Sequence, residues 1–154
     1  MTIYWPFFGP LIVICAMASL ISILTSNWPL LRVAVVLALN WLVNTVFCFL
    51  TGVYDPWQFF FVTDALSAMA ILLPPAGRVQ AVIGYTYIGQ LLVHVLYGLA
   101  RQPGTEHLYW AVLTEVGFVQ LALLGGWTGG YGGHRVWSLL RPHLSRLKSR
   151  FGMA

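Results

Sequence analysis

The chain has 154 residues, of which 59% are hydrophobic and only 8% are charged, and its formal net charge is +4. An average soluble domain has about 25% charged residues, so this chain has too few charges to cover a water-facing surface. Its aromatic and branched apolar content excludes a disordered chain, and its two cysteines exclude a disulfide scaffold. The composition therefore predicts an all-α integral membrane protein.

Five stretches are long and apolar enough to cross a hydrocarbon core of about 30 Å, which takes about 20 residues of helix. They make up a first domain, residues 1–127, and cover about 7–25, 31–50, 57–74, 79–99 and 108–127. The gaps between them contain prolines, which interrupt helices because they lack a backbone N–H donor. Since the connections are short, consecutive helices are expected to be antiparallel neighbours. The sequence thus predicts a five-helix transmembrane bundle.

Residues 128–154 are predicted to form a tail. Its start overlaps residues 125–133, in which six of nine residues are glycine, and this composition favours a flexible hinge. Beyond the hinge, apolar and basic residues recur at helical spacing, which predicts an amphipathic helix lying in the membrane interface. Its basic side chains are expected to contact lipid or a partner protein, or only to anchor the end of the chain: Arg135, Arg141, Arg146, Lys148 and Arg150.

The distribution of positive charge predicts the orientation. Five of the eight Lys and Arg residues lie in the tail, and positively charged segments stay in the cytoplasm. We therefore expect a cytoplasmic C-terminus and, after five spans, an N-terminus outside. The expected location is the bacterial inner (cytoplasmic) membrane.

Several polar residues lie inside the predicted spans. Counted at about 1.5 Å per residue, four of them fall within about 3 Å of one depth in the outer half: Asn44, Asp64, His94 and Glu115. Asn40, Gln90 and Tyr97 share helix faces with members of this layer. Because an acidic residue is costly in lipid, these faces are expected to point inward, with a contact between His94 and either Asp64 or Glu115.

Three interpretations of this polar layer compete. The side chains can hold helices together through hydrogen bonds, which is their commonest role in membrane proteins. They can instead form a proton or ion path, since intramembrane acids and histidines often mark such paths. A catalytic site is the third interpretation, because two acids and a histidine can perform acid–base chemistry.

The sequence contains no recognisable nucleophile motif, no Walker loop and no metalloprotease motif. Only one histidine, His94, lies inside a span, and Cys15 and Cys48 lie in different spans. We therefore expect a protein that is not an enzyme and that binds no cofactor, no metal and no nucleic acid.

Few spans, short loops and a basic C-terminal tail give the chain an outline that resembles the small holins of phages, although it has more spans than those proteins usually have. The resemblance implies self-association and passage of solutes through the membrane. We expect a homo-oligomer that conducts protons, ions or small solutes through the polar layer. The alternative is a non-catalytic accessory or scaffold subunit of a larger membrane complex, in which the polar groups only join helices.

Overall fold

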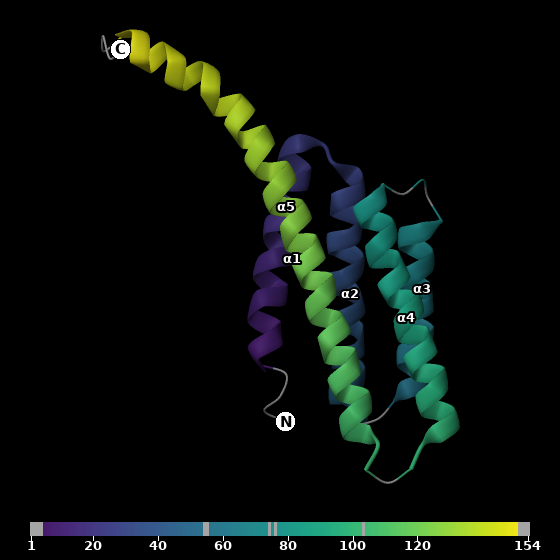
Figure 1. The fold of residues 1–154 in the computed structure, drawn as a ribbon. Helices are drawn as coiled ribbons and strands as arrows, with labels where there is room; N and C mark the ends of the chain where they lie inside the picture. Colours follow the sequence, from purple (N-terminus) through teal and green to yellow (C-terminus); the bar gives the residue numbers. More distant parts are fainter. Residues whose placement is uncertain (1–4, 54–55, 74, 76, 103, 151–154) are drawn as a thin grey trace.

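The computed structural model describes residues 5–53, 56–73, 75, 77–102 and 104–150, and for residues 5–8, 136, 139–140 and 142–150 it describes the backbone alone. The described residues form five helices, which confirms the predicted all-α class. The helices are α1 Trp5–Thr25, α2 Trp28–Thr51, α3 Trp57–Leu72, α4 Arg78–Ala100 and α5 Glu106–Arg150 (Figure 1). With the exception of the end of α5, their ends lie within three residues of the predicted boundaries.

Helix α2 shows how the local sequence sets these boundaries. The Asn27 side chain accepts a hydrogen bond from the Leu30 backbone N–H at 3.2 Å, and Pro29 occupies the first turn, where no N–H is needed. At the other end Gly52 has a φ of 64°, a left-handed conformation that glycine adopts without strain, and its N–H bonds to the Cys48 carbonyl. Capped ends of this kind let the chain reverse within a few residues.

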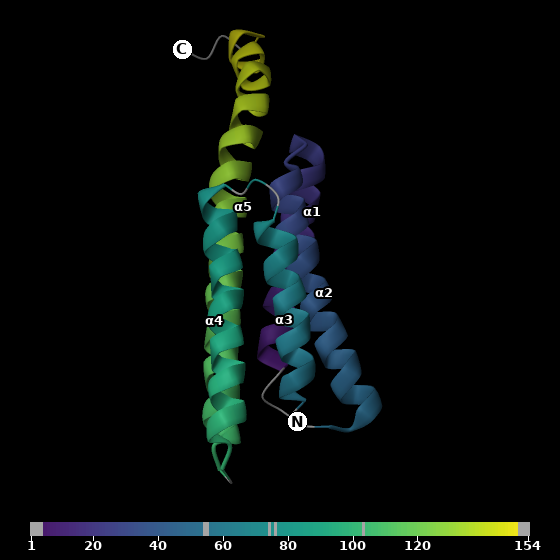
Figure 2. The ribbon, with the colours of Figure 1, turned by 90° about the vertical axis from the view of Figure 1, so that its right-hand side faces the viewer.

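The five helices form a closed ring. Each helix contacts the next one in the chain, and α5 returns to contact α1, while α2 makes weaker contacts across the ring to α4 and α5. Figures 1 and 2 show the helices lying roughly parallel to one axis, with the start of α1 and the end of α5 at opposite ends. Helix α5 also extends well beyond the other four (Figure 1).

The predicted hinge at residues 125–133 is wrong, because these residues are helical within an uninterrupted α5. Two of the glycines let α1 approach closely instead: a Cβ at Gly132 would lie 2.8 Å from Ile21 Cδ1, and one at Gly125 would lie 3.8 Å from Ile14 Cδ1. Close helix contact is the usual role of small residues in apolar helices. Residues 128–150 therefore continue the fifth helix and are not separated from it by a flexible segment.

Helices α3 and α4 pack closely near both ends of α3. A Cβ at Gly84 would lie 2.5 Å from Leu72 Cδ2, and one at Gly98 would lie 2.7 Å from Trp57 Cη2. Both distances are far shorter than a normal contact between carbon atoms. The absence of a side chain at these two positions fixes how α3 lies against α4, which in turn positions the polar residues between them.

Large apolar side chains cover the outside of the ring. Leu99, Phe49 and Leu24 are 82%, 76% and 71% exposed. The interior, in contrast, contains buried polar side chains, namely Ser22, Asn40, Asp64, Ser67, Gln80, Gln90, His94, Gln120 and Thr128. Buried hydrophobic side chains still outnumber the polar ones, so it is the extensive apolar exterior that departs from a typical water-soluble protein.

Three helical segments are long and apolar enough to cross a membrane: Trp28–Thr51, Arg78–Ala100 and Glu106–Arg135. Two shorter apolar helices, Gly9–Thr25 and Trp57–Leu72, complete the ring. The structure therefore contains all five helical stretches that the sequence indicates, three of them of full spanning length.

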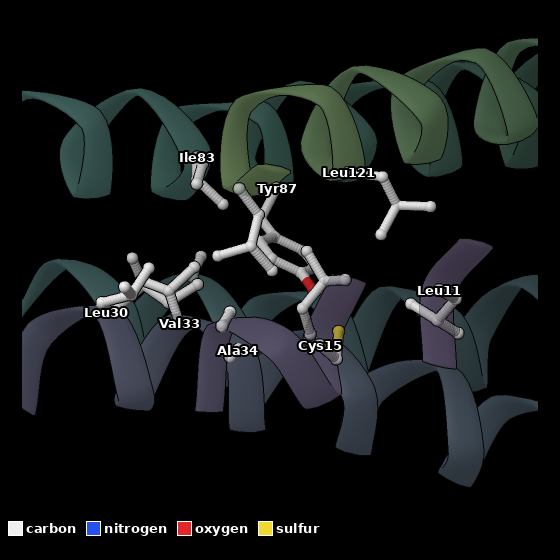
Figure 3. Packing of buried hydrophobic residues seen from close by; sticks show 13 residues of the cluster. Leu11, Cys15, Leu30, Val33, Ala34, Ile83, Tyr87 and Leu121 are labelled. Carbon is white, nitrogen blue, oxygen red and sulfur yellow. The ribbon is translucent and has the colours of Figure 1, made fainter. Parts of the chain in front are cut away.

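Two apolar clusters fill the interior. The larger one contains buried side chains from all five helices, including Cys15, Leu30, Val33, Ile83, Tyr87 and Leu121 (Figure 3). The smaller one is largely aromatic and contains Phe60, Tyr97, Tyr109 and Leu113, with Trp57 and Trp110 packed against it. Along α3, Asp64 and Ser67 lie between members of the two clusters, as do Gln90 and His94 along α4. Asp64, Ser67, Gln90 and His94 are thus flanked by apolar side chains towards both ends of the ring.

Candidate functional site

The centre of the candidate site is a pair of ionisable side chains on adjacent helices. His94 Nε2 of α4 lies 2.9 Å from Asp64 Oδ2 of α3. The histidine is fully buried and the aspartate is 3% exposed. Of the two contacts that the sequence suggested for His94, the structure forms the one with Asp64.

The other ring nitrogen of His94 faces α5. His94 Nδ1 lies 2.8 Å from Tyr109 Oη, and the Tyr109 ring stacks on Tyr97 at a centroid distance of 4.1 Å. Tyr97 is buried, and the Arg101 guanidinium lies 6.0 Å from the centre of its ring. His94 therefore bridges Tyr109 and Asp64 through its two nitrogens, and stacked aromatic rings cover the Tyr109 side.

Asn40 of α2 contacts the second oxygen of the Asp64 carboxylate. Its Nδ2 donates to Asp64 Oδ1 at 2.8 Å and to Ser67 Oγ at 3.0 Å. Asn44, one turn away, donates from its Nδ2 to Asn40 Oδ1 at 3.3 Å and accepts from Thr63 Oγ1 at 2.8 Å. One hydrogen-bonded network, the Asp64 network, thus joins α2, α3, α4 and α5 around the Asp64–His94 pair.

Gln90 belongs to a second, neutral group, one turn along α4 from His94. Gln120 of α5 donates from its Nε2 to Gln90 Oε1 and to Thr86 Oγ1, at 3.0 Å in each case. Among the residues that the structure describes, no hydrogen bond connects this group to the Asp64 network. It joins α4 to α5 through amide and hydroxyl groups that do not titrate near neutral pH.

The structure does not bring Glu115 into the polar layer, so the expectation that it faces inward is wrong. Glu115 is exposed on α5, whereas Tyr109, Leu113 and Gln120 of the same helix are buried. The reason is geometric: five residues separate Glu115 from Gln120, which places the two side chains about 140° apart around the helix axis. Counting residues gives the depth of Glu115 but not the side of the helix on which it lies.

The tail residues lie on the part of α5 that extends beyond the ring. Arg135 and Arg141 are exposed, and the Arg135 guanidinium lies 5.9 Å from the centre of the Tyr131 ring. The predicted contacts of Arg146, Lys148 and Arg150 depend on side chains that lie outside the described residues.

Two residues that complete the Asp64 network, Tyr109 and Thr63, are not among those that the sequence indicates. Tyr109 lies three residues past the start of α5, and Tyr97 and His94 lie three and six residues before the end of α4. Because α4 and α5 are antiparallel neighbours, similar distances from their shared turn place Tyr109 at the level of Tyr97 and His94. This count of residues from the shared turn could have identified Tyr109 from the sequence.

The Asp64 network can hold and transfer a proton. His94 has two nitrogens on opposite sides of its ring, so it can accept a proton at Nδ1 while it releases another from Nε2 to Asp64 Oδ2. A metal would need more ligands: among the described residues, no group of three or more His, Cys, Asp or Glu side chains is placed to hold one.

Comparison with protein-family models, with curated proteins and with solved structures finds no match to this chain.

Proposed function

We propose that this chain is an integral membrane protein whose five helices cross the bilayer, and that it conducts protons through the Asp64–His94 pair. The observation that supports proton transfer most directly is the bridging position of His94, with 2.8 Å from Nδ1 to Tyr109 Oη and 2.9 Å from Nε2 to Asp64 Oδ2. The proposal has two parts, membrane insertion and proton transfer, which rest on different evidence.

Membrane insertion is supported by the distribution of polarity. Exposed leucines and aromatic residues cover the ring, while carboxyl, imidazole and amide groups lie inside it. A soluble protein rarely exposes a contiguous apolar surface of this extent, because such a surface promotes aggregation in water. In lipid the same surface is favourable, and helices satisfy their own backbone hydrogen bonds there.

The proposed orientation places the start of α1 outside and the end of α5 in the cytoplasm. Arg135 and Arg141 then lie on the cytoplasmic side, in agreement with the preference for positive charge there. Helix α3 has 16 residues, which corresponds to about 24 Å, somewhat less than a typical hydrocarbon core. Helix α3 packs closely against the longer helix α4, and α4 spans the part of the hydrocarbon core that α3 does not reach.

Proton transfer would proceed across the His94 ring. A proton that reaches Nδ1 from the Tyr109 side makes the imidazole cationic, and release of the Nε2 proton to Asp64 Oδ2 returns it to the neutral form. The Asn40 amide donates to the other carboxylate oxygen at 2.8 Å, which keeps that oxygen an acceptor and directs the proton to Oδ2. The step moves one proton from Tyr109, three residues past the start of α5, to Asp64, seven residues past the start of α3, and Tyr109 takes up a proton from its own end of the ring to replace the one it gives.

The enclosure of the network favours protons over larger solutes. Apolar side chains flank it towards both ends of the ring, so a conducted species has to pass between them, and His94 is fully buried. A proton can move along hydrogen bonds with small rearrangements of side chains, whereas an ion with its hydration shell requires a wide aqueous path. We therefore infer that protons are the conducted species.

Proton flux into liposomes tests this function. The purified protein is reconstituted around a pH-sensitive dye, a potassium diffusion potential is applied, and wild type is compared with Asp64→Asn. We expect flux to fall about 100-fold in the variant, because the amide cannot accept the proton from His94 Nε2. Glu106→Gln is the matched control, since it makes the same chemical change at the exposed start of α5 and should conduct like the wild type.

Two results would contradict the proposed conduction. One is equal flux in the wild type and in Asp64→Asn, which would leave the network only a role in holding helices together. The other is absence of flux in the wild type when alkaline carbonate fails to remove the protein from the membrane, which would separate insertion from conduction.

A second function, that of an accessory subunit in a larger membrane complex, is favoured by the position of Glu115. This carboxylate lies on the outer, otherwise apolar face of α5 and has no hydrogen-bond or ion-pair partner among the described residues. A neighbouring protein in the membrane would supply one.

A further inference from the structure

The outer face of α5 carries an acidic residue where the proposed membrane insertion, on which this inference rests, would place lipid. Glu115 lies nine residues past the start of α5, about 14 Å along the helix. Its neighbours on this face are apolar, with Leu108 and Val119 exposed at 69% and 50%. An ionisable residue at this depth normally faces protein and a partner of opposite charge, so the face is expected to be covered.

No cation of the described chain can reach Glu115. Arg101 and His107 lie at the outer end of α4 and α5, about 12 Å or more from Glu115 along the axis, and Arg135 lies about 30 Å away in the other direction. Arg32 is the fifth residue of α2 and Arg78 the first residue of α4, and both lie at the same end of the ring as Arg135. A second copy in the same orientation would bring its own cations to these same two levels. Charge complementarity therefore points to a different protein.

The rest of this face allows a helix to come close. A Cβ added at Gly126, Gly130 or Gly133 would have nothing within 4 Å, in contrast to Gly125 and Gly132, which pack against α1. These open positions and Glu115 lie on the same side of α5, and small residues allow helix backbones to approach each other in lipid. The open face of α5 therefore offers both packing space and a single charged contact.

We propose that the open face of α5 binds a transmembrane helix of another membrane protein, and that this helix carries a lysine or arginine at the depth of Glu115. The ion pair would fix the depth of the partner helix, and the glycine positions would receive its apolar side chains. The proposal names a site that lies outside the ring and away from the Asp64 network, so the two can be tested separately.

A designed peptide provides the probe. The peptide is a 22-residue alanine- and leucine-rich transmembrane helix with one lysine nine residues from its outer end, and its binding is measured by energy transfer to the labelled protein in liposomes. We expect the lysine peptide to bind, and Glu115→Gln to weaken the binding about tenfold. Glu106→Gln is the matched control and should bind as the wild type does. Because Glu115 is exposed, its substitution should not disturb the ring.

Three results would overturn the proposal: equal binding of a peptide with leucine in place of the lysine, binding that Glu115→Gln leaves unchanged, or self-association of the wild type that Glu115→Gln abolishes. The last result would assign the face to a second copy of the chain. If alkaline carbonate removes the protein from membranes, the proposed function fails and this inference fails with it. If Asp64→Asn stops proton flux while the lysine peptide does not bind, only this inference fails.

Discussion

Replacement of His94 by leucine should destabilise the protein more than the loss of two ordinary hydrogen bonds. The substitution keeps an apolar side chain of moderate size in the fully buried position, but it removes the partners of Asp64 Oδ2 and Tyr109 Oη. Asp64 is 3% exposed, so water cannot replace the lost contact without rearrangement. The loss in free energy of unfolding therefore depends on whether Asp64 carries a charge when His94 is removed.

The expected loss of stability differs between a charged and a neutral Asp64–His94 pair. If the pair holds a charge, removal of one partner leaves it buried and unpaired, which costs about 3–5 kcal/mol. If both groups are neutral, two interhelical hydrogen bonds are lost, at about 0.6 kcal/mol each in membrane proteins, or about 1.2 kcal/mol together. The gap between these values exceeds the usual error of an unfolding measurement. We expect the larger value.

The measurement is reversible unfolding in mixed micelles, followed by circular dichroism. Gln90→Leu is the matched control: it removes one neutral interhelical bond, with Gln120, from the same helix and should cost no more than about 1.7 kcal/mol. Addition of Asp64→Leu to His94→Leu should recover stability, because the unpaired carboxylate is gone. A loss near 1.2 kcal/mol for His94→Leu, with a further loss in the double variant, would refute the reasoning.

Two further predictions concern the packing and ends of the helices. Gly98→Ala should lower the free energy of unfolding by about 1–3 kcal/mol, because the new Cβ would lie 2.7 Å from the Trp57 ring. Gly89 is exposed on the same helix, and a Cβ there would have nothing within 4 Å. Gly89→Ala should therefore raise the free energy of unfolding by about 0.5–1 kcal/mol. Equal effects of the two variants in thermal unfolding would contradict the close packing of α3 on α4. Asn27→Ala should cost about 1 kcal/mol, since it removes the acceptor that caps α2, and Asn27→Asp should retain most of the stability; if both unfold at the same temperature as the wild type, the cap is unimportant.

The sequence was sufficient to predict the helices and the matching levels of Asp64 and His94 along them. Apolar runs separated by prolines indicate the helix ends, and residue counting places Asp64 and His94 at similar distances from the same end of the bundle. Helix α4 also reveals its inward face, because Tyr87, Gln90 and His94 follow helical spacing and all three are buried. Where a polar stripe exists, both depth and direction can therefore be inferred.

Helix α5 could not be oriented in the same way. Its polar residues Thr114, Glu115 and Gln120 point in different directions around the helix axis, so no polar stripe distinguishes the inward from the outward face. The one available constraint was that Glu115 and Gln120, about 140° apart, cannot both point to the ring interior. Which of them does so depends on the neighbours of α5, and the return of α5 to α1 is a long-range contact that no local pattern encodes.

The glycine-rich segment misled for a different reason. In water a run of glycines behaves as a flexible linker, because the exposed backbone can bond to solvent. Beside apolar helices a broken backbone would leave N–H and C=O groups without partners, so the helix is retained. Gly132 then gains a role that composition does not reveal, since it is the contact point for Ile21 of α1.

Asp64 and Glu115, the two acidic residues away from the helix ends, differ in whether their partners come from within the chain. Asp64 has its partners within one chain, with His94 and Asn40 at 2.9 and 2.8 Å, so its role does not depend on another protein. Glu115 has none among the described residues, and under the proposed membrane insertion a neighbouring protein would supply one. Asp64→Asn should therefore act on proton flux and on the stability of the isolated protein, and Glu115→Gln on assembly alone. If Glu115→Gln also stopped the flux, the conducting unit would have to include the partner helix, and conduction by the single ring would be excluded.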